Sequence, residues 1–421
     1  MKIVFVLECA GRMTNGTTAT CIRFAEELTQ RGHQVTIIGC EKDNVDPKIE
    51  NYVTLDTFHF PVFNKLILKE GFTFVKVQPE KMVDVIKEAD VVHIFIPFKL
   101  ANTARLIAET YGVPVTSAFH LQPDSISSAI HLEWFHPLTN TLYYSFRKYI
   151  YDEVPLIHCP SEMISNLLKN KYNYKAETRV ISNGLNVDFW HRVDSEKEEQ
   201  FKDKFVVCMV GRLAKEKRQD VLIKAVKMSK HEKDIQLILC GQGPNKSNLE
   251  FLIKKTKLTN EPVFEFKSQE DLRYLLSSID LYVHCSDAEI EGLSCVEAFS
   301  CGAVPVISDS KISATQNFAL DENSLFKRAN VQDLANKIDY WFEHPEERKA
   351  LSQKYQELAK SYAIPLQVDK FEEFFEEAIK IKKEGRDPAD LKMKLSDKRR
   401  RKNIFKRMLK KGAIDKMPEG I

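Results

Sequence analysis

The sequence predicts an α/β protein built from two tandem units, each a parallel sheet covered by helices. Three observations lead to this prediction. Short runs that are apolar on both faces alternate with amphipathic stretches, as expected of strands covered on both sides by helices. The alternation runs through the first 160 residues and begins again near residue 204. The length of 421 residues also suits two or three domains.

The first unit opens with residues 2–7, an apolar run rich in residues that favour strands. Residues 18–31 follow with Ile22, Ala25 and Leu28 at helical spacing, which predicts the first helix. Further apolar runs predict strands at residues 34–39, 91–96, 114–118 and 156–159.

The second unit repeats this order. Strands are predicted at residues 204–210, 235–240, 263–266, 281–284 and 303–307, with helices at 220–228, 248–255, 272–278 and 295–300. The join falls near 180–204, where a Ser-Asn-Gly turn and a charged stretch are typical of a boundary. Because ligands bind at the carboxyl ends of parallel strands, two such units predict a ligand-binding cleft.

The net charge of +2 conceals a strong asymmetry along the chain. Residues 380–421 hold 16 Lys or Arg and 6 Asp or Glu, a charge of +10, which leaves −8 for the other 379 residues. The chain after about 345 is helical in pattern, and a basic tail of this kind is typical of surface binding. We therefore expect four segments: 1–180 and 181–355 as the α/β domains, 356–384 as helices returning to the first domain, and 385–421 as a basic tail.

The N-terminus and the cysteines predict an intracellular protein. The first apolar run is too short for a signal peptide and fits a first strand, and no run reaches the roughly 18–20 apolar residues of a membrane-spanning helix. The nine cysteines form no Cys-x-x-Cys pair and sit mostly in apolar segments. They are expected to be reduced core residues.

The sharpest chemical signal is the segment 286–306. A strand runs into an acidic loop, and a helix begins near Leu293. Glu289 in the loop and Glu297 in the first helical turns bracket seven residues, so both can face one ligand at the helix N-terminus. The free N–H groups and partial positive charge at that end suit a phosphate. The alternative is that the two acids only cap the helix.

This spacing resembles the E-x7-E region of retaining glycosyltransferases of family 4, and the resemblance covers most of residues 1–380. It implies the GT-B fold: two Rossmann-like domains facing across a cleft, with C-terminal helices crossing back to the first domain. It also implies that Glu289 meets the donor sugar, Glu297 the ribose, and the N–H groups around Leu293 and Ser294 the diphosphate. Glu291 stands where an aromatic residue is common in the family.

A second segment, 210–220, places two cations after the first strand of the second unit. Arg212 and Lys217 are expected to converge above the strand end, where Arg can bridge two phosphate oxygens and Lys acts as a point charge. The family pattern is similar and assigns both residues to the donor diphosphate. Arg218 replaces the usual glycine after the Lys. The alternative for lone basic residues is a solvated surface.

Four weaker positions fit the same resemblance. His120 follows a strand of the first domain, where the family has a His that contacts the donor sugar; a structural His is the alternative. Gly16 lies in the loop 10–17, which resembles the family's glycine-containing loop and suits close approach to a phosphate. Asn183 and Gly241 belong to turns that resemble the family's Asn-Gly and Gly-x-Gly-Pro turns, and plain turns explain both equally well.

The resemblance implies transfer of a hexose, glucose or galactose, from a nucleotide sugar such as UDP-glucose or UDP-galactose with retention at the anomeric carbon. No cofactor is expected, because the sequence has no Asp-x-Asp and its 11 His are not at ligand spacing. Arg212, Lys217 and the helix N-terminus are then expected to stabilise the leaving diphosphate in place of a metal. The acceptor hydroxyl is expected to attack directly, while Glu289 as a covalent nucleophile is an alternative.

The tail predicts contact with an anionic membrane surface. Ile404, Phe405, Met408 and Leu409 fall on one helical stripe, and basic residues cover the other faces, a composition typical of interfacial helices. The expected membrane-binding residues are Arg399, Arg400, Arg401, Lys402, Phe405, Lys406 and Arg407. Aromatic and basic stretches at 58–74 and 131–151 point the same way.

The stretch from Ala118 to Pro160 resembles bacterial glycosyltransferases that act on diacylglycerol or related lipids. It implies a lipid acceptor such as diacylglycerol or ceramide, glycolipid synthesis, and a cytoplasmic enzyme peripheral to the inner face of the cell membrane. The alternatives are a transferase of capsular or surface polysaccharide synthesis, a nucleic-acid-binding protein that uses the basic tail, and a sugar-nucleotide sensor without catalysis. No recognised nucleic-acid module accompanies the tail, so no nucleic-acid partner is expected.

Overall fold

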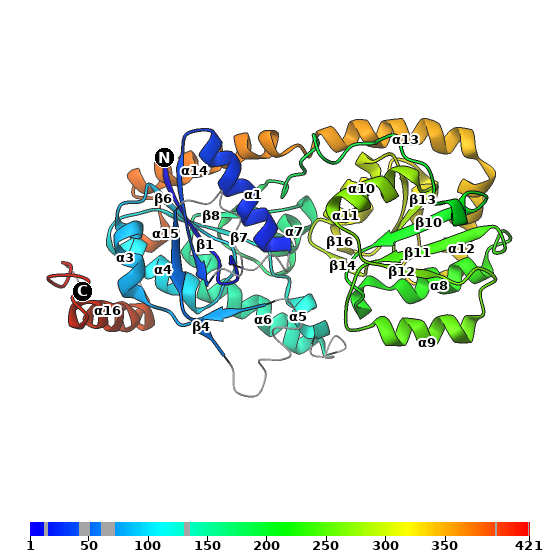
Figure 1. Cartoon of the computed structure of the whole chain (residues 1–421). Coiled ribbons are helices and arrows are strands. Elements are labelled where there is room, and N and C mark those ends of the chain that lie inside the picture. The colour runs from blue at the N-terminus through cyan, green and yellow to red at the C-terminus, as the bar shows by residue number, and fades with distance from the viewer. Residues whose placement is uncertain (12–15, 42–50, 60–71, 130–134, 392–393, 420) are drawn as a thin grey trace. The chain divides into compact units, whose positions relative to one another are not determined.

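Two parallel sheets, each with helices on its faces, form the two units of the chain (Figure 1). The computed structural model describes residues 1–11, 16–41, 51–59, 72–129, 135–391, 394–419 and 421. Unit 1 comprises Met1–Ile181 and Gln367–Ile421, and unit 2 comprises Ser182–Leu366. The return of the C-terminal helices to unit 1 was predicted from the sequence resemblance.

The sheet of unit 1 has seven parallel strands in the order β3-β2-β1-β6-β7-β8-β9. The central strands are buried along nearly their whole length, which explains their continuous apolar runs. A separate antiparallel pair, β4 (Thr57–Phe58) with β5 (Phe74–Val75), lies outside this sheet. The seven strands are β1 (Lys2–Val6), β2 (Gln34–Cys40), β3 (Tyr52–Leu55), β6 (Val91–Ile94), β7 (Val115–Ala118), β8 (Leu156–Cys159) and β9 (Glu177–Val180).

The helices of unit 1 come from both ends of the chain. The long helix α14 places Phe371 against the buried aromatic core, where its ring stacks on Phe24 at 4.6 Å. The helices are α1 (Gly16–Gln30), α3 (Pro79–Lys87), α4 (Lys99–Thr110), α5 (Pro123–Ala129), α6 (His136–Tyr149), α7 (Glu162–Asn166), α14 (Ile364–Lys383), α15 (Pro388–Leu391) and α16 (Leu395–Lys410).

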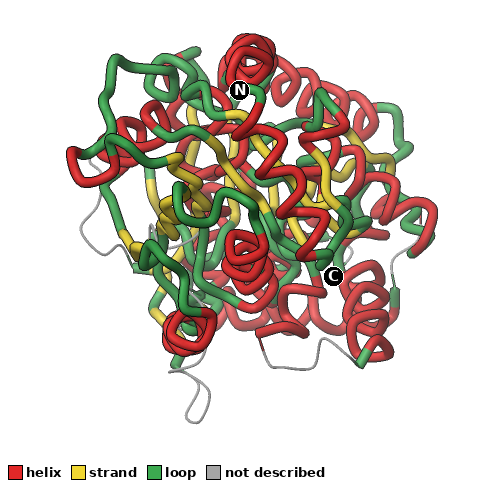
Figure 2. The backbone as a smooth tube through the Cα atoms, turned by 90° about the vertical axis from the view of Figure 1, so that its right-hand side faces the viewer, coloured by secondary structure: helices red, strands yellow, loops and turns green. Residues whose placement is uncertain are grey.

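The sheet of unit 2 has six parallel strands in the order β12-β11-β10-β13-β15-β17. Helices lie around the strands (Figure 2). The strands are β10 (Phe205–Val210), β11 (Ile235–Cys240), β12 (Val263–Glu265), β13 (Leu281–His284), β15 (Val304–Ser308) and β17 (Leu325–Phe326). The helices are α8 (Gln219–Met228), α9 (Lys246–Thr256), α10 (Gln269–Ser278), α11 (Leu293–Ser300), α12 (Val331–Glu343) and α13 (Pro345–Lys360). A small pair, β14 (Ala288–Glu289) with β16 (Ile312–Ser313), lies beside them.

The nine cysteines are buried and unbridged, as the sequence predicts. Among the described residues, no helix has the length and apolarity needed to cross a bilayer.

The structure corrects the prediction for the tail. Helix α16 packs against α3 and α4 of unit 1 (Figure 1), and the side chains of Phe405 and Met408 are fully buried. The Phe405 ring lies 5.9 Å from that of Tyr111. The apolar stripe of α16 therefore completes the protein interior. The prediction that Phe405 contacts a membrane is wrong for this conformation.

Buried ion pairs hold the same helix. The guanidinium of Arg105, 1% exposed, donates to Asp397 at 2.7 Å and to Glu109 at 2.6 Å. Arg401, expected at a membrane, instead pairs with Glu109 at 3.0 Å and is only 12% exposed. Basic side chains remain on the outer face of the helix, at Arg399, Arg400, Lys402, Lys406 and Arg407. The aromatic stretches 58–74 and 131–151 lie partly outside the described residues.

Candidate functional site

The candidate site lies at the carboxyl ends of β10, β11 and β13 in unit 2, the edge at which parallel sheets bind ligands. Each strand is apolar and buried, and each ends in a polar loop. β10 leads into Arg212 and Lys217, and β13 ends at His284 and leads into Glu289. The sheet therefore brings together Lys217 and Glu289, which are 72 residues apart in the sequence.

An ion-pair cluster forms the centre of this edge. The ammonium of Lys217 donates to Oε1 of Glu289, and Nε2 of His284 lies 3.2 Å from the same oxygen. The side chains of Lys217 and Glu289 are 19% and 14% exposed, so a ligand can reach both. The sequence predicted Lys217 and Glu289 as separate ligand contacts, and the structure brings them into direct contact.

The charge of this cluster is fixed by its neighbours. Burial alone would raise the pKa of Glu289, but the positive charge of Lys217 and the hydrogen bond to His284 outweigh burial and hold that pKa well below its usual range. Glu289 is therefore a carboxylate at neutral pH. It can accept hydrogen bonds or stabilise positive charge, but it has no proton to donate.

Helix α11 begins directly after this acidic loop. Its N-cap, Gly292, has φ +91°, and a Cβ there would lie 2.2 Å from the Cγ2 of Thr315, so only glycine fits. The first turn presents the backbone N–H groups of Leu293 and Ser294, which an anion can bind. Glu297 lies one turn further along the same helix.

Two loops pack backbone to backbone beside Lys217. A Cβ at Gly241 would lie 2.0 Å from the carbonyl oxygen of Gly211, and one at Gly243 would lie 2.3 Å from that of Leu213. Gly241, predicted to bind the donor, thus allows the loop after β11 to support the loop that carries Arg212. The stem of Lys217 passes over Gly211, 4.0 Å from the Cβ position.

The two arginines of the loop between β10 and α8, residues 211–218, differ in exposure and in backbone conformation. Arg212 contacts Glu216 at 3.3 Å and its side chain is 37% exposed. Arg218 adopts a left-handed backbone with φ +56°, a conformation that favours the glycine usual in the family. Its side chain bonds Asp220 at 3.1 Å and Asp287 at 3.2 Å, and these ion pairs offset the backbone cost.

Glu291 points into the protein. It is 2% exposed, and its carboxylate accepts hydrogen bonds from the hydroxyl of Ser182 and from the backbone N–H of Asn183 at 3.1 Å. The acidic loop is thereby tied to the first residues of unit 2. Asn183, predicted to bind the donor, uses its backbone for this contact, while its side-chain Oδ1 is buried without a partner among the described residues.

The remaining predicted residues lie in unit 1. His120 follows β7, is 7% exposed, stacks on Phe95 at 5.5 Å and meets the edge of His158 at 5.1 Å. Burial lowers its pKa well below the ordinary value, so the imidazole is neutral. Gly16 is the exposed first residue of α1, with open space where a Cβ would lie, while residues 12–15 of the same loop lie outside the described part of the chain.

Two family models match the chain, one over most of the N-terminal part of unit 1 and one over most of unit 2. Residues 14–189 match "Glycosyltransferase Family 4", and residues 191–358 match "Glycosyl transferases group 1". The chain belongs to glycosyltransferase family 4. The predictions of the family and of its GT-B fold are confirmed.

Relatives of this family 4 glycosyltransferase include lipid-modifying enzymes. Alpha-monoglucosyldiacylglycerol synthase is 25% identical over 310 residues in Streptococcus pneumoniae, covering 69% of this chain and 67% of its own. In Acholeplasma laidlawii it is 26% identical over 392 residues, covering 86% and 94%.

Solved structures also resemble the glycosyltransferase. Anabaena HepE in complex with UDP superposes with a TM-score of 0.69 at 17% identity, covering 90% of this chain and all of its own. The catalytic domain of the Helicobacter pylori cholesterol-alpha-glucosyltransferase is 43% identical over 38% of this chain and 99% of its own, with a TM-score of 0.35.

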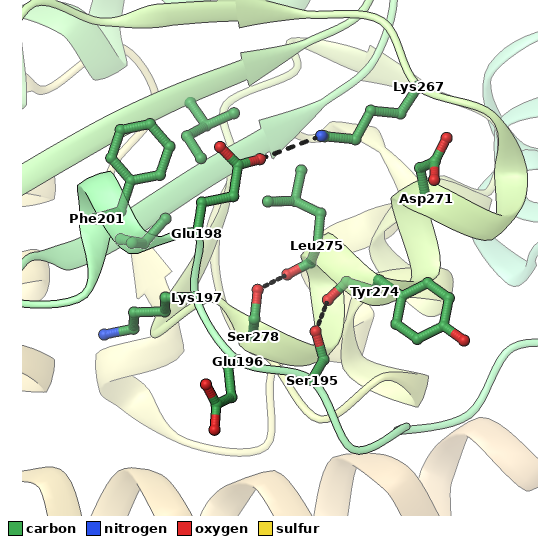
Figure 3. Close-up of a pocket in the computed structure, with 12 residues that line it drawn as sticks. Ser195, Glu196, Lys197, Glu198, Phe201, Lys267, Asp271, Tyr274, Leu275 and Ser278 are labelled. Carbon is green, nitrogen blue, oxygen red and sulfur yellow. Dashed lines mark hydrogen bonds and ion pairs between the residues drawn. The ribbon is translucent and has the colours of Figure 1, made fainter.

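A pocket elsewhere in unit 2 of the glycosyltransferase does not carry this chemistry (Figure 3). It is lined by residues 195–198, by part of α10 and by Lys267. Lys267 pairs with Glu198 at 3.5 Å and with Glu265 at 3.2 Å, and Ser195 donates to the carbonyl of Tyr274. None of the lining residues belongs to the ion-pair cluster.

Two residues of the candidate site were not predicted from the sequence. His284 is 1% exposed and reaches Glu289 from the last position of β13, and Tyr282 lies 3.3 Å from both His284 Nδ1 and Ser294 Oγ. The signal for His284 was its place at a strand end five residues before Glu289. Tyr282 alternates with apolar residues in a buried strand and carried no such signal.

Proposed function

We propose that this glycosyltransferase moves a hexose, glucose or galactose, from a UDP-sugar to a membrane lipid such as diacylglycerol or ceramide, with retention of the anomeric configuration. The observation that carries the proposal is the Lys217–Glu289–His284 cluster beside the N-terminus of α11. The names of the diacylglycerol-modifying relatives support the acceptor class, and the UDP in HepE supports the nucleotide.

The proposed donor site works through electrostatics. A nucleoside diphosphate leaves as an anion, and Lys217, Arg212 and the N–H groups of Leu293 and Ser294 supply positive charge and donors where that anion develops. In such a site one charge-assisted donor is worth about 10²–10³ in turnover. Lys217 exchanges part of its contact with Glu289 for a phosphate oxygen when the donor binds.

Glu289 is proposed to act as a permanent carboxylate toward the sugar. Its depressed pKa excludes general-acid catalysis at neutral pH. With Oε1 held by Lys217 and His284, Oε2 accepts hydrogen bonds from sugar hydroxyls. The acceptor hydroxyl attacks the anomeric carbon on the face of the leaving group, the C–O bond to the diphosphate breaks, and the hydroxyl proton passes to a phosphate oxygen. Glu297 binds the ribose, and His120 contacts the sugar.

The tail is proposed to adsorb on anionic lipid through charge alone. Because Phe405 and Met408 are buried, the contribution comes from the outward basic side chains, each worth about 1 kcal/mol near an anionic leaflet. Replacing Arg399, Lys402 and Lys406 by Glu should abolish co-sedimentation with phosphatidylglycerol vesicles. The same change at exposed lysines of unit 2, Lys230, Lys255 and Lys354, should leave it intact. Equal binding of both variants would refute this role for the tail.

A panel of donors and acceptors tests the reaction itself. The full chain is incubated with UDP-glucose, UDP-galactose or GDP-mannose and with diacylglycerol, ceramide, cholesterol or no lipid, and products are read by mass and by anomeric proton NMR. We expect an α-linked hexosyl lipid from a UDP-sugar. A β-linked product, or transfer only to soluble glycans, would contradict the proposal.

A further inference from the structure

Glu8 is a buried carboxyl group to which neither the family resemblance nor the donor chemistry gives a role. Glu8 lies two residues beyond the end of β1 in unit 1, and only 3% of its surface is exposed. Oε1 accepts a hydrogen bond from the backbone N–H of Leu100 at 3.2 Å, in the first turn of α4. Oε2 is buried and has no hydrogen-bond partner among the described residues.

The sheet places Glu8 at the ligand-binding edge. The pairing with the neighbouring strand β2 continues as far as Glu8, because the backbone N–H of Cys40 donates to the carbonyl oxygen of Glu8 at 2.9 Å. On the other side of β1, the strand β6 lies between β1 and β7. The sheet register places Val6 of β1 beside Ile94 of β6, and Ile94 beside Ser117 of β7. The carboxyl end of β1 therefore lies at the same edge as the end of β7, where His120 follows.

His120 shares the unusual feature of Glu8. Its Nε2 is also buried without a partner among the described residues. Buried polar atoms in folded proteins are nearly always hydrogen-bonded, so each exception requires an explanation. At this edge of the sheet Glu8 Oε2 and His120 Nε2 are such exceptions, as is Nε2 of Gln122 among the described residues, and they indicate atoms that a polar ligand bonds.

Capping of α4 does not account for Glu8. A capping role uses Oε1 and leaves Oε2 unexplained, and a neutral Gln or Asn would cap the helix without the cost of burying an acid. Burial raises the pKa of Glu8 to about 8, and the hydrogen bond from Leu100 opposes that rise. The fold thus keeps a buried acid just after a strand whose buried residues, from Ile3 to Val6, are apolar.

We propose that Oε2 of Glu8 binds the acceptor, accepting a hydrogen bond from the hydroxyl group that receives the sugar. This inference rests on the proposed function, and it assigns the acceptor hydroxyl to unit 1 and the donor diphosphate to unit 2. The bond orients the hydroxyl oxygen for attack. The hydroxyl proton itself leaves with the donor phosphate as described above.

The test compares Glu8→Gln with the wild-type full chain. Glutamine keeps the Oε1 contact to Leu100 but places an amide NH₂, which cannot accept a hydrogen bond, where Oε2 lies. We expect KM for dihexanoylglycerol, a soluble acceptor that removes membrane effects, to rise at least tenfold, or transfer to fall by that factor. Hydrolysis of UDP-glucose without acceptor should change less than twofold.

Two further variants complete the design. Asp339→Asn removes a buried carboxylate of the unit 2 scaffold, which bonds Ser229 and Lys230, and should leave both reactions unchanged. Glu8→Asp, which keeps an acceptor on a shorter side chain, should recover part of the transfer. Normal acceptor kinetics in Glu8→Gln would overturn the inference, as would a parallel loss of hydrolysis and transfer. Failure of the wild-type chain to turn over UDP-glucose at all would instead overturn the proposed function.

Discussion

The edge of the unit 2 sheet favours ionised side chains, and the same edge of the unit 1 sheet favours neutral ones. In unit 2, Lys217 and Glu289 contact each other, and the pKa of Glu289 is depressed so that the pair stays ionised. In unit 1, burial raises the pKa of Glu8 to about 8 and lowers the pKa of His120. One architecture therefore supports two environments, one suited to an anionic diphosphate and one to a neutral hydroxyl. The difference lies in the residues that follow the strands.

Removing the cation of unit 2 should give the largest effect. Lys217→Ala should lower transfer by about 10²–10³, the value of one donor at a developing anion, with the thermal midpoint within a few degrees of wild type. The matched control is Lys215→Ala, an exposed lysine of the same 3-10 turn, which should keep its activity. Near-normal turnover in Lys217→Ala would show that this lysine does not stabilise the leaving diphosphate.

Acid should destabilise unit 1 through its buried histidines. His158 is fully buried, its Nε2 lies 2.7 Å from the carbonyl of Ile181, and burial lowers its pKa from 6.5 to about 4. The unfolded chain binds the proton of His158 more tightly than the folded chain does. The contribution of neutral His158 to the free energy of unfolding is therefore fully present above pH 6.5 and declines as the pH falls below 6.5. The loss reaches about 3 kcal/mol near pH 4. Urea unfolding across this range measures it.

His158→Gln sharpens that prediction, because an amide keeps a donor for Ile181 and has no ionisation in this range. The variant should lose less stability between pH 7 and pH 4 than the wild type, by roughly the same 3 kcal/mol. Parallel stability curves for the two proteins would show that the histidine is not held neutral by the fold.

The link from Glu291 to Ser182 should be worth about 2 kcal/mol, the range of a hydrogen bond to a charged group. Glu291→Gln and Ser182→Ala should each lower the stability of unit 2, and the double variant should cost little more than either single one. This non-additivity is measured as a double-mutant cycle by urea unfolding. Strictly additive losses would mean that the two residues act independently.

The smallest effect is expected at Arg218. Arg218→Gly removes two ion pairs but relieves a left-handed backbone, so unfolding free energy should change by less than about 1 kcal/mol. Arg218→Ala loses the ion pairs and keeps the backbone cost, and it should be the less stable of the two. The opposite order, by calorimetry, would contradict the role given to the conformation.

Sequence predicted the central strands well because they are buried on both faces and therefore apolar. The edge strands β3, β9 and β17 were not predicted, because they are short and partly exposed. Lys217 and Glu289 were predicted as separate residues. Their contact, and the inward turn of Glu291, depend on loop conformation, which spacing does not encode.

The tail shows where a sequence pattern is ambiguous. An amphipathic basic helix has the same periodicity whether its apolar stripe enters a bilayer or packs on a protein. What decides between them is the partner surface, and α3 and α4 supply it together with the buried Arg105. That surface comes from residues some 300 positions earlier in the chain.

The proposal that the donor diphosphate binds to the cations and the helix N-terminus of unit 2 is tested most directly by hydrogen–deuterium exchange of the full chain, with and without UDP. We predict protection of the loops at 211–217 and 289–297, and no change at 195–198 or at the strand ends 7–11 and 117–120 of unit 1. Protection confined to the strand ends of unit 1 or to the pocket at 195–198, with none at Lys217 or Glu289, would contradict the account.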